Sequence, residues 1–184
     1  MVTTPLPTPL DLDAWFDLPE DELERHELVA GYVTMSPGES YENRRVGTRV
    51  MLAFHRVLGD DYLPVTDLDI VISEVPATVR RPDVVIAHGD AVRGAKRVRG
   101  RDVEVVVEIV SPGSVETDWL RKRSEYAAAG VPTYVVVDVR DTPRVAVFDR
   151  VEAGSYVDPT GDGRVGVVTV AGREVVLRVE ELQA

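Results

Sequence analysis

Cysteine is absent from the 184 residues of this chain, which excludes a disulfide framework and a thiolate metal site. Long apolar runs are also missing. None approaches the ~20 residues that a membrane-spanning helix needs, and the opening MVTTPLPTPL lacks the basic stretch and apolar block of a secretion signal. We therefore expect a cytoplasmic protein in which any metal is held by oxygen or histidine ligands.

Basic side chains are the minority among the charged residues. The chain has 21 of them against 32 acidic residues, which gives a formal net charge of −11. Because nucleic-acid affinity depends largely on cationic contacts with phosphate, this balance weighs against a DNA-binding protein. Residues 93–101 are locally basic and form a candidate phosphate-facing loop, although a solvated surface loop is the interpretation we favour. The basic residues of this segment are Arg93, Lys96, Arg97, Arg99 and Arg101.

The composition, with 44% hydrophobic and 29% charged residues, suits one globular domain. Residues 1–9 contain three prolines and three threonines without periodicity, so we expect a flexible lead-in at 1–9 followed by a single domain at 10–184.

Hydrophobic periodicity predicts alternating helices and strands. Helical segments are expected at 11–18, 21–27, 39–58 and from Ser114 or Thr117 to Gly130. Strands are expected at 28–35, 62–66, 68–72, 84–87, 103–110, 134–139, 145–148, 166–170 and 175–179. The predicted fold class is α/β, with a central mixed β-sheet flanked by helices and an antiparallel β extension at the C-terminus.

A carboxylate interrupts the apolar strand VEVVVEIV. Since side chains alternate between the two faces of a strand, Glu108 shares its face with valines. Asp83 raises the same question, because it leads directly into the apolar run that begins at Val84. Burying a carboxylate costs several kcal/mol unless a cation, a metal or hydrogen-bond donors compensate it. Both residues therefore require partners.

A lysine lies on the inward face of the helix that follows. Trp119, Lys122, Tyr126 and Ala129 are spaced by three, four and three residues, which places them on one helical face. A lysine near two buried carboxylates remains charged and offsets them. We therefore expect Asp83, Glu108 and Lys122 to converge in one site.

Such a site suits phosphodiester hydrolysis. Two carboxylates from neighbouring strands are appropriate ligands for Mg²⁺ or Mn²⁺, which prefer oxygen donors. The metal would lower the pKa of a bound water, and an ammonium group would orient that water or stabilise the transition state. No histidine or serine nucleophile is required.

A longer pattern contains these three residues and resembles the Uma-two family of restriction endonucleases, in the PD-(D/E)XK nuclease superfamily. The resemblance covers roughly residues 27–148, and its densest part reads E-x-x-S-P…D-x-x-x-K-x-x-x-Y-x-x-x-G-V. The matching positions are Pro82-Asp83, Val107 to Pro112, Asp118, Lys122, Tyr126, Gly130-Val131 and Tyr134 to Asp138.

The resemblance implies a restriction-endonuclease-like fold and a Mg²⁺-dependent endonuclease acting on DNA. It implies that Lys122 supplies the lysine expected two residues after the glutamate, where this chain has Val110, and that Glu27 joins Asp83 and Glu108 at the metal. Relatives commonly place a histidine shortly after the turn at Ser36-Pro37, and this chain has none there.

Each candidate residue also has a structural interpretation. Asp83 and Glu108 could meet arginine or backbone donors, Lys122 could pair with Asp118, and Glu27 could lie beside a helix end. Ser111, Asp118 and Tyr126 are candidates to support the metal-binding residues from behind. Ser111 and Asp118 could instead cap a helix or brace a turn, and Tyr126 and Trp119 could fill the core.

Two other classes of function fit the same residues. The first is a non-catalytic binding or assembly module, including one that forms a homodimer, that keeps the nuclease fold, and the negative net charge favours it. The second is hydrolysis of a smaller phosphate ester.

Overall fold

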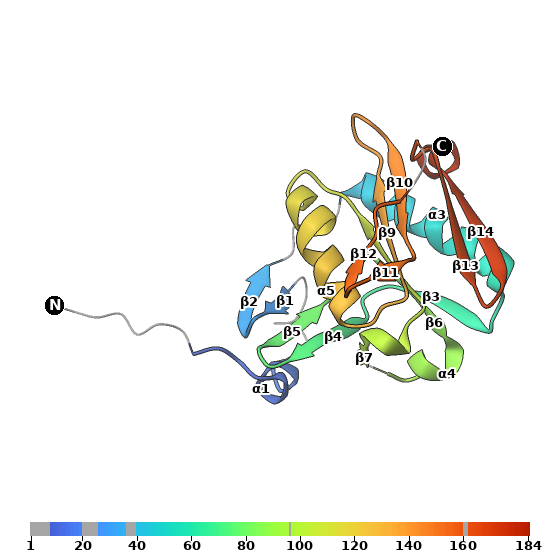
Figure 1. The fold of residues 1–184 in the computed structure, drawn as a ribbon. Helices are drawn as coiled ribbons and strands as arrows, with labels where there is room; N and C mark the ends of the chain where they lie inside the picture. The colour runs from blue at the N-terminus through green and yellow to red at the C-terminus, as the bar shows by residue number, and fades with distance from the viewer. Residues whose placement is uncertain (1–7, 20–25, 36–39, 96, 160–161) are drawn as a thin grey trace.

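The computed structural model describes residues 8–19, 26–35, 40–95, 97–159 and 162–184. Two five-stranded sheets organise these residues, and helices pack against them (Figure 1). Within the described ranges no helix is both long and apolar enough to cross a membrane. The helical elements are α1 (Leu12–Phe16), α3 (Tyr41–Leu58), α4 (Gly89–Val92), the 3-10 turn η1 (Gly100–Asp102), the π-helical turn η2 (Thr117–Lys122), α5 (Arg123–Ala128) and α6 (Val179–Gln183).

The central sheet has the strand order β10-β9-β8-β6-β3. Within it β8 and β9 run parallel, because η2 and α5 carry the chain back between them, and the other neighbouring pairs are antiparallel. The sheet is therefore mixed, as the sequence predicted. Its strands are β3 (Tyr62–Val65), β6 (Val84–His88), β8 (Val105–Ile109), β9 (Thr133–Asp138) and β10 (Arg144–Phe148).

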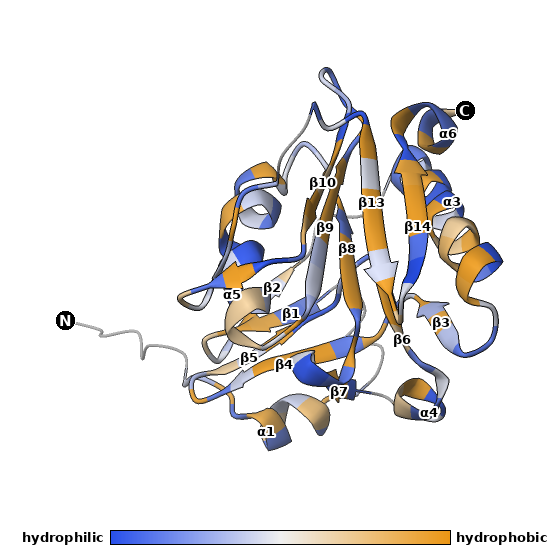
Figure 2. Cartoon of the chain, turned by 45° about the vertical axis from the view of Figure 1, so that its right-hand side comes forward, coloured by the Kyte–Doolittle hydropathy of each residue, from blue (hydrophilic) through white to orange (hydrophobic). Residues whose placement is uncertain are grey.

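Both faces of the central sheet are covered. Val105 and Val107 of β8 pack on the face that holds α3, together with the hairpin of β13 (Val165–Val170) and β14 (Arg173–Arg178). Val106 packs on the opposite face with Tyr126 of α5. Double coverage explains the long valine runs, which Figure 2 shows as hydrophobic stretches in β8, β9 and β10. Glu108 lies on the α5 side of this sheet.

The second sheet has the order β2-β1-β5-β4-β7 and carries the N-terminal part of the chain. The hairpin of β1 and β2 turns at Ala30-Gly31, both with positive φ, as a two-residue hairpin turn requires. Its strands are β1 (His26–Val29), β2 (Tyr32–Met35), β4 (Asp69–Glu74), β5 (Ala77–Arg80) and β7 (Arg97–Arg99); a short ribbon of β11 (Val151–Glu152) and β12 (Ser155–Tyr156) lies outside both sheets.

Several predicted elements are confirmed, and others need correction. Helix α3 ends at Gly59, the predicted cap, and Ser40 caps its start by accepting the N–H of Asn43. The single strand expected at 28–35 is instead the β1–β2 hairpin. The prediction of a helix at 21–27 is wrong for residues 26 and 27, which belong to β1. Its other residues, 21–25, lie outside the described ranges. The lead-in at 1–9 also lies mostly outside them.

The basic segment at 93–101 is not one continuous loop, because it contains strand β7 and the start of the turn η1. Arg97 and Arg99 belong to β7, on the far edge of the N-terminal sheet. Arg97 lies over the ring of Phe16 at 4.1 Å, and Arg99 pairs with Glu74 at 2.8 Å. Lys96 lies outside the described residues. Arg97 and Arg99 are exposed, as the favoured interpretation of a solvated surface segment predicts, and they contact other parts of the same chain.

Candidate active site

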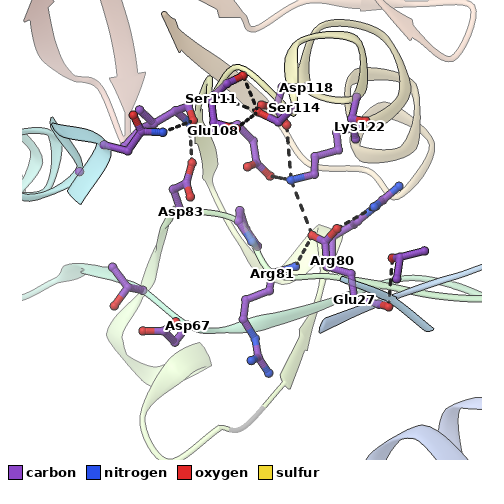
Figure 3. A pocket seen from close by; sticks show the side chains of 18 of the residues that line it. Glu27, Asp67, Arg80, Arg81, Asp83, Glu108, Ser111, Ser114, Asp118 and Lys122 are labelled. Atoms are coloured by element: carbon purple, nitrogen blue, oxygen red, sulfur yellow. Dashed lines mark hydrogen bonds and ion pairs between the residues drawn. The ribbon is translucent and has the colours of Figure 1, made fainter. Parts of the chain in front are cut away.

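The predicted catalytic and metal-binding residues line one cleft of about 780 Å³; they are Glu27, Asp83, Glu108 and Lys122. The β1–β2 hairpin, helix α3 and the segment from 111 to 122 contribute to its walls, and Asp83 and Glu108 also line it. Continuing the β6–β8 register by one residue places Asp83 directly opposite Glu108 on neighbouring strands. Opposite residues of an antiparallel pair project to the same face. Figure 3 shows the Glu108 carboxylate beside Lys122 and the Asp83 carboxylate bonded to the backbone of the neighbouring strand.

Glu108 is held by two donors. It is 3% exposed, and its Oε1 lies 2.9 Å from the Nζ of Lys122 and accepts the hydroxyl of Tyr126 at 2.7 Å. Lys122 is 7% exposed, so its ammonium group does not reach bulk solvent. These contacts give Glu108 and Lys122 the partners that their burial demands.

The helix after β8 begins with the wide π-helical turn η2, which contains both Asp118 and Lys122. A π turn is closed by i→i+5 hydrogen bonds and brings residues four apart close to one face; such turns often occur at functional sites. Asp118 is 1% exposed, and its Oδ1 lies 3.5 Å from Nζ of Lys122. Among the described residues this oxygen has no hydrogen-bond donor.

Glu27 enters from β1 and is engaged on both oxygens. Its Oε2 accepts from Arg80 at 2.8 Å, and its Oε1 accepts the backbone N–H of Arg81 at 3.1 Å and lies 3.6 Å from Nζ of Lys122. Arg80 is 2% exposed and makes two further bonds to the carboxylate of Glu125 on α5, at 2.7 and 2.9 Å. This arginine therefore joins the N-terminal sheet to the helix that carries Tyr126.

The protonation behaviour of the acids follows from their neighbours. Burial raises the pKa of Glu108 to about 7; Lys122 opposes this shift, and the carboxylates of Asp118 and Glu27 add to it. Burial likewise raises the pKa of Asp118. Burial alone would raise the pKa of Glu27 too, but Lys122 and Arg80 together hold it below its ordinary value. One cluster thus contains acids with divergent affinities for a proton, a property that often accompanies catalytic sites.

The pKa of Lys122 lies above its ordinary value. Burial would lower it, but the carboxylates of Glu108, Glu27, Asp118 and Asp83 outweigh that effect. The lysine therefore remains protonated throughout the physiological range and acts as a fixed positive charge.

Asp83 is oriented by the backbone of the adjacent strand. Its Oδ2 accepts the N–H of Ile109 at 2.5 Å. The carbonyl oxygen of Ile109 accepts a hydrogen bond from Nδ2 of Asn43 at 3.2 Å. Asn43 is 8% exposed and lies at the start of α3. The backbone N–H and C=O groups of Ile109, at the end of β8, are therefore both engaged.

The chemistry of these donors fits a hard divalent cation. Four carboxylates act on a single ammonium group, so negative charge is in excess there. In the described ranges no set of three or more Asp, Glu or His side chains is arranged to hold a metal, and both oxygens of Glu27 already accept hydrogen bonds from Arg80 and Arg81. Mg²⁺ commonly uses one or two carboxylates and keeps several waters. Asp83 and Glu108 fit that requirement.

The structure brings the predicted residues together. Asp83, Glu108, Lys122 and Glu27 line the cleft, together with Ser111 and Asp118, while Tyr126 lies behind Glu108 in the core. Ser111 braces the turn at Ser114, whose hydroxyl accepts its N–H at 3.0 Å. Trp119 packs edge-on against Phe148, as a core aromatic.

Three contributors were not anticipated: Arg80, Glu125 and Asn43. Arg80 precedes Pro82-Asp83 in the sequence, so an arginine before a strand-end aspartate was the available signal. Its burial could not be predicted, because its partners lie 53 and 45 residues away.

Comparison with known proteins yields one family and a related fold. Residues 12–178 match the model of the Uma2 family, described as "Putative restriction endonuclease". The crystal structure of a protein described as a putative nuclease from Anabaena variabilis superposes with a TM-score of 0.71 and 15% sequence identity, over 95% of this chain and 98% of that one. At this identity the similarity shows a shared fold. No curated protein matches the chain.

Proposed function

Because this chain belongs to the Uma2 family of "putative restriction endonucleases", we propose that it is a metal-dependent endonuclease that hydrolyses phosphodiester bonds in DNA, on a restriction-endonuclease-like fold. The observation that carries this proposal is the convergence of Asp83, Glu108 and Lys122 in one cleft. Two carboxylates from neighbouring strands line this cleft, and the buried ammonium group of Lys122 lies 2.9 Å from one of them, Glu108.

Asp83 and Glu108 would hold Mg²⁺ or Mn²⁺. When bound, the cation lowers the pKa of a water and neutralises charge that develops on the phosphate. The chain's own residues supply the rest. The hydrogen bond from Ile109 orients Asp83, and the hydroxyl of Tyr126 orients Glu108. Preorganised groups of this kind require little rearrangement during the reaction.

Lys122 would orient the attacking water or stabilise the negative charge of the transition state. Its position supports either role, because it remains protonated and lines the cleft beside Glu108 and Asp118. Arg80 contacts Glu27 rather than the proposed metal-binding residues Asp83 and Glu108, so it is a positioning residue.

Metal-dependent cleavage is the first test. Supercoiled plasmid and single-stranded DNA would be incubated with the protein and Mg²⁺, with Mn²⁺, or with a chelator. We expect nicked or shortened products only when a divalent cation is present, because the two carboxylates repel a phosphate until a cation neutralises them. Cleavage that persists unchanged in the chelator would contradict the proposed role of the metal.

The net charge of −11 favours one rival, a non-catalytic binding or assembly module. A protein of that class would bind Mg²⁺ at the cleft and still leave every DNA substrate intact. That outcome would replace the endonuclease proposal.

A further inference from the structure

Strand β2 is exposed in a way that edge strands of monomeric proteins usually avoid. It is the last strand of its sheet, and in Figure 1 no described strand lies beyond it. All four residues are exposed, and three are large and apolar: Tyr32 at 47%, Val33 at 47% and Met35 at 76%. Edge strands are commonly protected by lysine, proline or a bulge, and β2 contains neither of those residues.

The hairpin register fixes which backbone groups face outward. In an antiparallel ladder with a two-residue turn, the hydrogen-bonded pairs are Val29–Tyr32 and Glu27–Thr34. The N–H and C=O groups of Val33 and Met35 therefore point to the outer edge. An added strand would bond to these two residues.

We propose that β2 pairs antiparallel with β2 of a second copy of this chain. A two-fold axis through Thr34 sets Val33 of each copy opposite Met35 of the other, so the outward groups of both strands are satisfied by about four hydrogen bonds. Thr34 then faces its own counterpart in the non-hydrogen-bonded pair at the centre. The pairing joins the two N-terminal sheets into one.

The charge distribution around β2 favours a second copy of this chain as the partner that pairs with this strand. Residues 28–38 contain no charged side chain, although the chain carries a net charge of −11. Two copies can therefore meet at β2 without bringing like charges into contact, and a partner recognised through its basic residues would find no acidic group on this strand. Because the strand is only four residues long, we expect a weak dimer that dissociates in about the micromolar range.

The pairing would place two clefts on either side of the axis. Thr34 is the cross-strand partner of Glu27 and lines the cleft. Three strand spacings of ~4.8 Å would separate the two Glu27 residues, by about 14 Å. Two clefts at this spacing suit a substrate with two strands, such as duplex DNA, and this part of the inference rests on the proposed function. The dimer itself is tested without substrate.

Molecular mass in solution tests the pairing directly. We expect sedimentation velocity of the full chain at about 1 to 200 µM to show a concentration-dependent dimer, and Val33→Lys to weaken association at least tenfold. The matched control is Val167→Lys, at a valine that is 43% exposed on β13, and it should dimerise as the parent does. A monomer at every concentration, or equal effects of both variants, would overturn the inference.

A cross-link tests the register. The chain has no cysteine, so Thr34→Cys introduces a single thiol at the proposed axis, where paired Cβ atoms lie within disulfide range. A mild oxidant should convert most of this variant to a covalent dimer. Thr169→Cys, on an exposed position of β13, should remain largely monomeric. Equal cross-linking of the two variants would show random collision and contradict the register.

Discussion

Replacing Glu108 with glutamine should lower metal-dependent DNA cleavage by about 10²- to 10³-fold and, at the same time, stabilise the metal-free protein at pH 8. The loss of cleavage follows from removal of one strand carboxylate of the proposed metal site. The gain in stability has a separate cause. Burial raises the pKa of Glu108 to about 7, so ionising this residue is less favourable in the folded protein than in the unfolded chain.

The sign of the stability effect depends on pH. For an acid whose pKa is raised by folding, the stability that the protonated form contributes is fully present at low pH and is lost as the pH rises through about 7. Glutamine imitates the protonated acid at every pH. The variant and the parent should therefore unfold at similar urea concentrations at pH 5, and by pH 8 the variant should be more stable by roughly 2 to 3 kcal/mol.

Glu104→Gln is the matched control for this variant. Glu104 immediately precedes β8 and is not among the residues of the cleft. We expect this control to change neither cleavage nor its pH dependence. Full cleavage by Glu108→Gln would show that Glu108 has no catalytic role. A loss of stability at pH 8 would show that the ionised form of Glu108 stabilises the folded protein.

Replacing Lys122 with methionine should have the largest effect on stability. Its ammonium lies 2.9 Å from Glu108, 3.5 Å from Asp118 and 3.6 Å from Glu27, and removing one partner of a buried ion pair typically costs about 3 to 5 kcal/mol. We expect a loss of that size at pH 8 and a smaller one at pH 5, where Glu108 is protonated. Urea unfolding at the two pH values measures both. Cleavage should also be lost.

The exposed neighbour Arg121 provides the control. Arg121→Met removes a positive charge from the same turn, but at an exposed position, so its effect on unfolding should be within about 0.5 kcal/mol. Millimolar Mg²⁺ should restore part of the stability that Lys122→Met loses, because a cation binding only the folded state stabilises it. An equal loss at both pH values would contradict the charge imbalance inferred for this cluster.

Much of the fold was predictable because the relevant signals are local. Helix α3 has a polar cap at Ser40 and a closing glycine at Gly59, and the central strands are runs of valine. The strands β5 and β7 were missed, since ATVR and RVR are too short to show periodicity. The basic residues near β7 were assigned to a loop because their contacts with Phe16 and Glu74 lie far away in the sequence.

The site was predictable to the extent that burial could be inferred from alternation. Glu108 interrupts an apolar strand and Lys122 an apolar helical face, and each pattern implied a partner. Arg80 gave no such signal, because its charge is typical of a strand end and its burial depends on Glu27 and Glu125 from other elements. Similarly, the engagement of both Glu27 oxygens, which argues against a simple three-carboxylate metal site, is visible only in three dimensions.

Calorimetric titration of the metal-free protein with Mg²⁺ at pH 8 tests the central claim most directly. We predict one saturable site in the parent and in Glu104→Gln, and loss of that site in both Asp83→Asn and Glu108→Gln. Both carboxamide variants keep the size of the native side chain, so a difference in binding reports the charge of that oxygen donor. Undiminished binding in both variants, or no binding by the parent, would show that these two carboxylates do not form a divalent metal site.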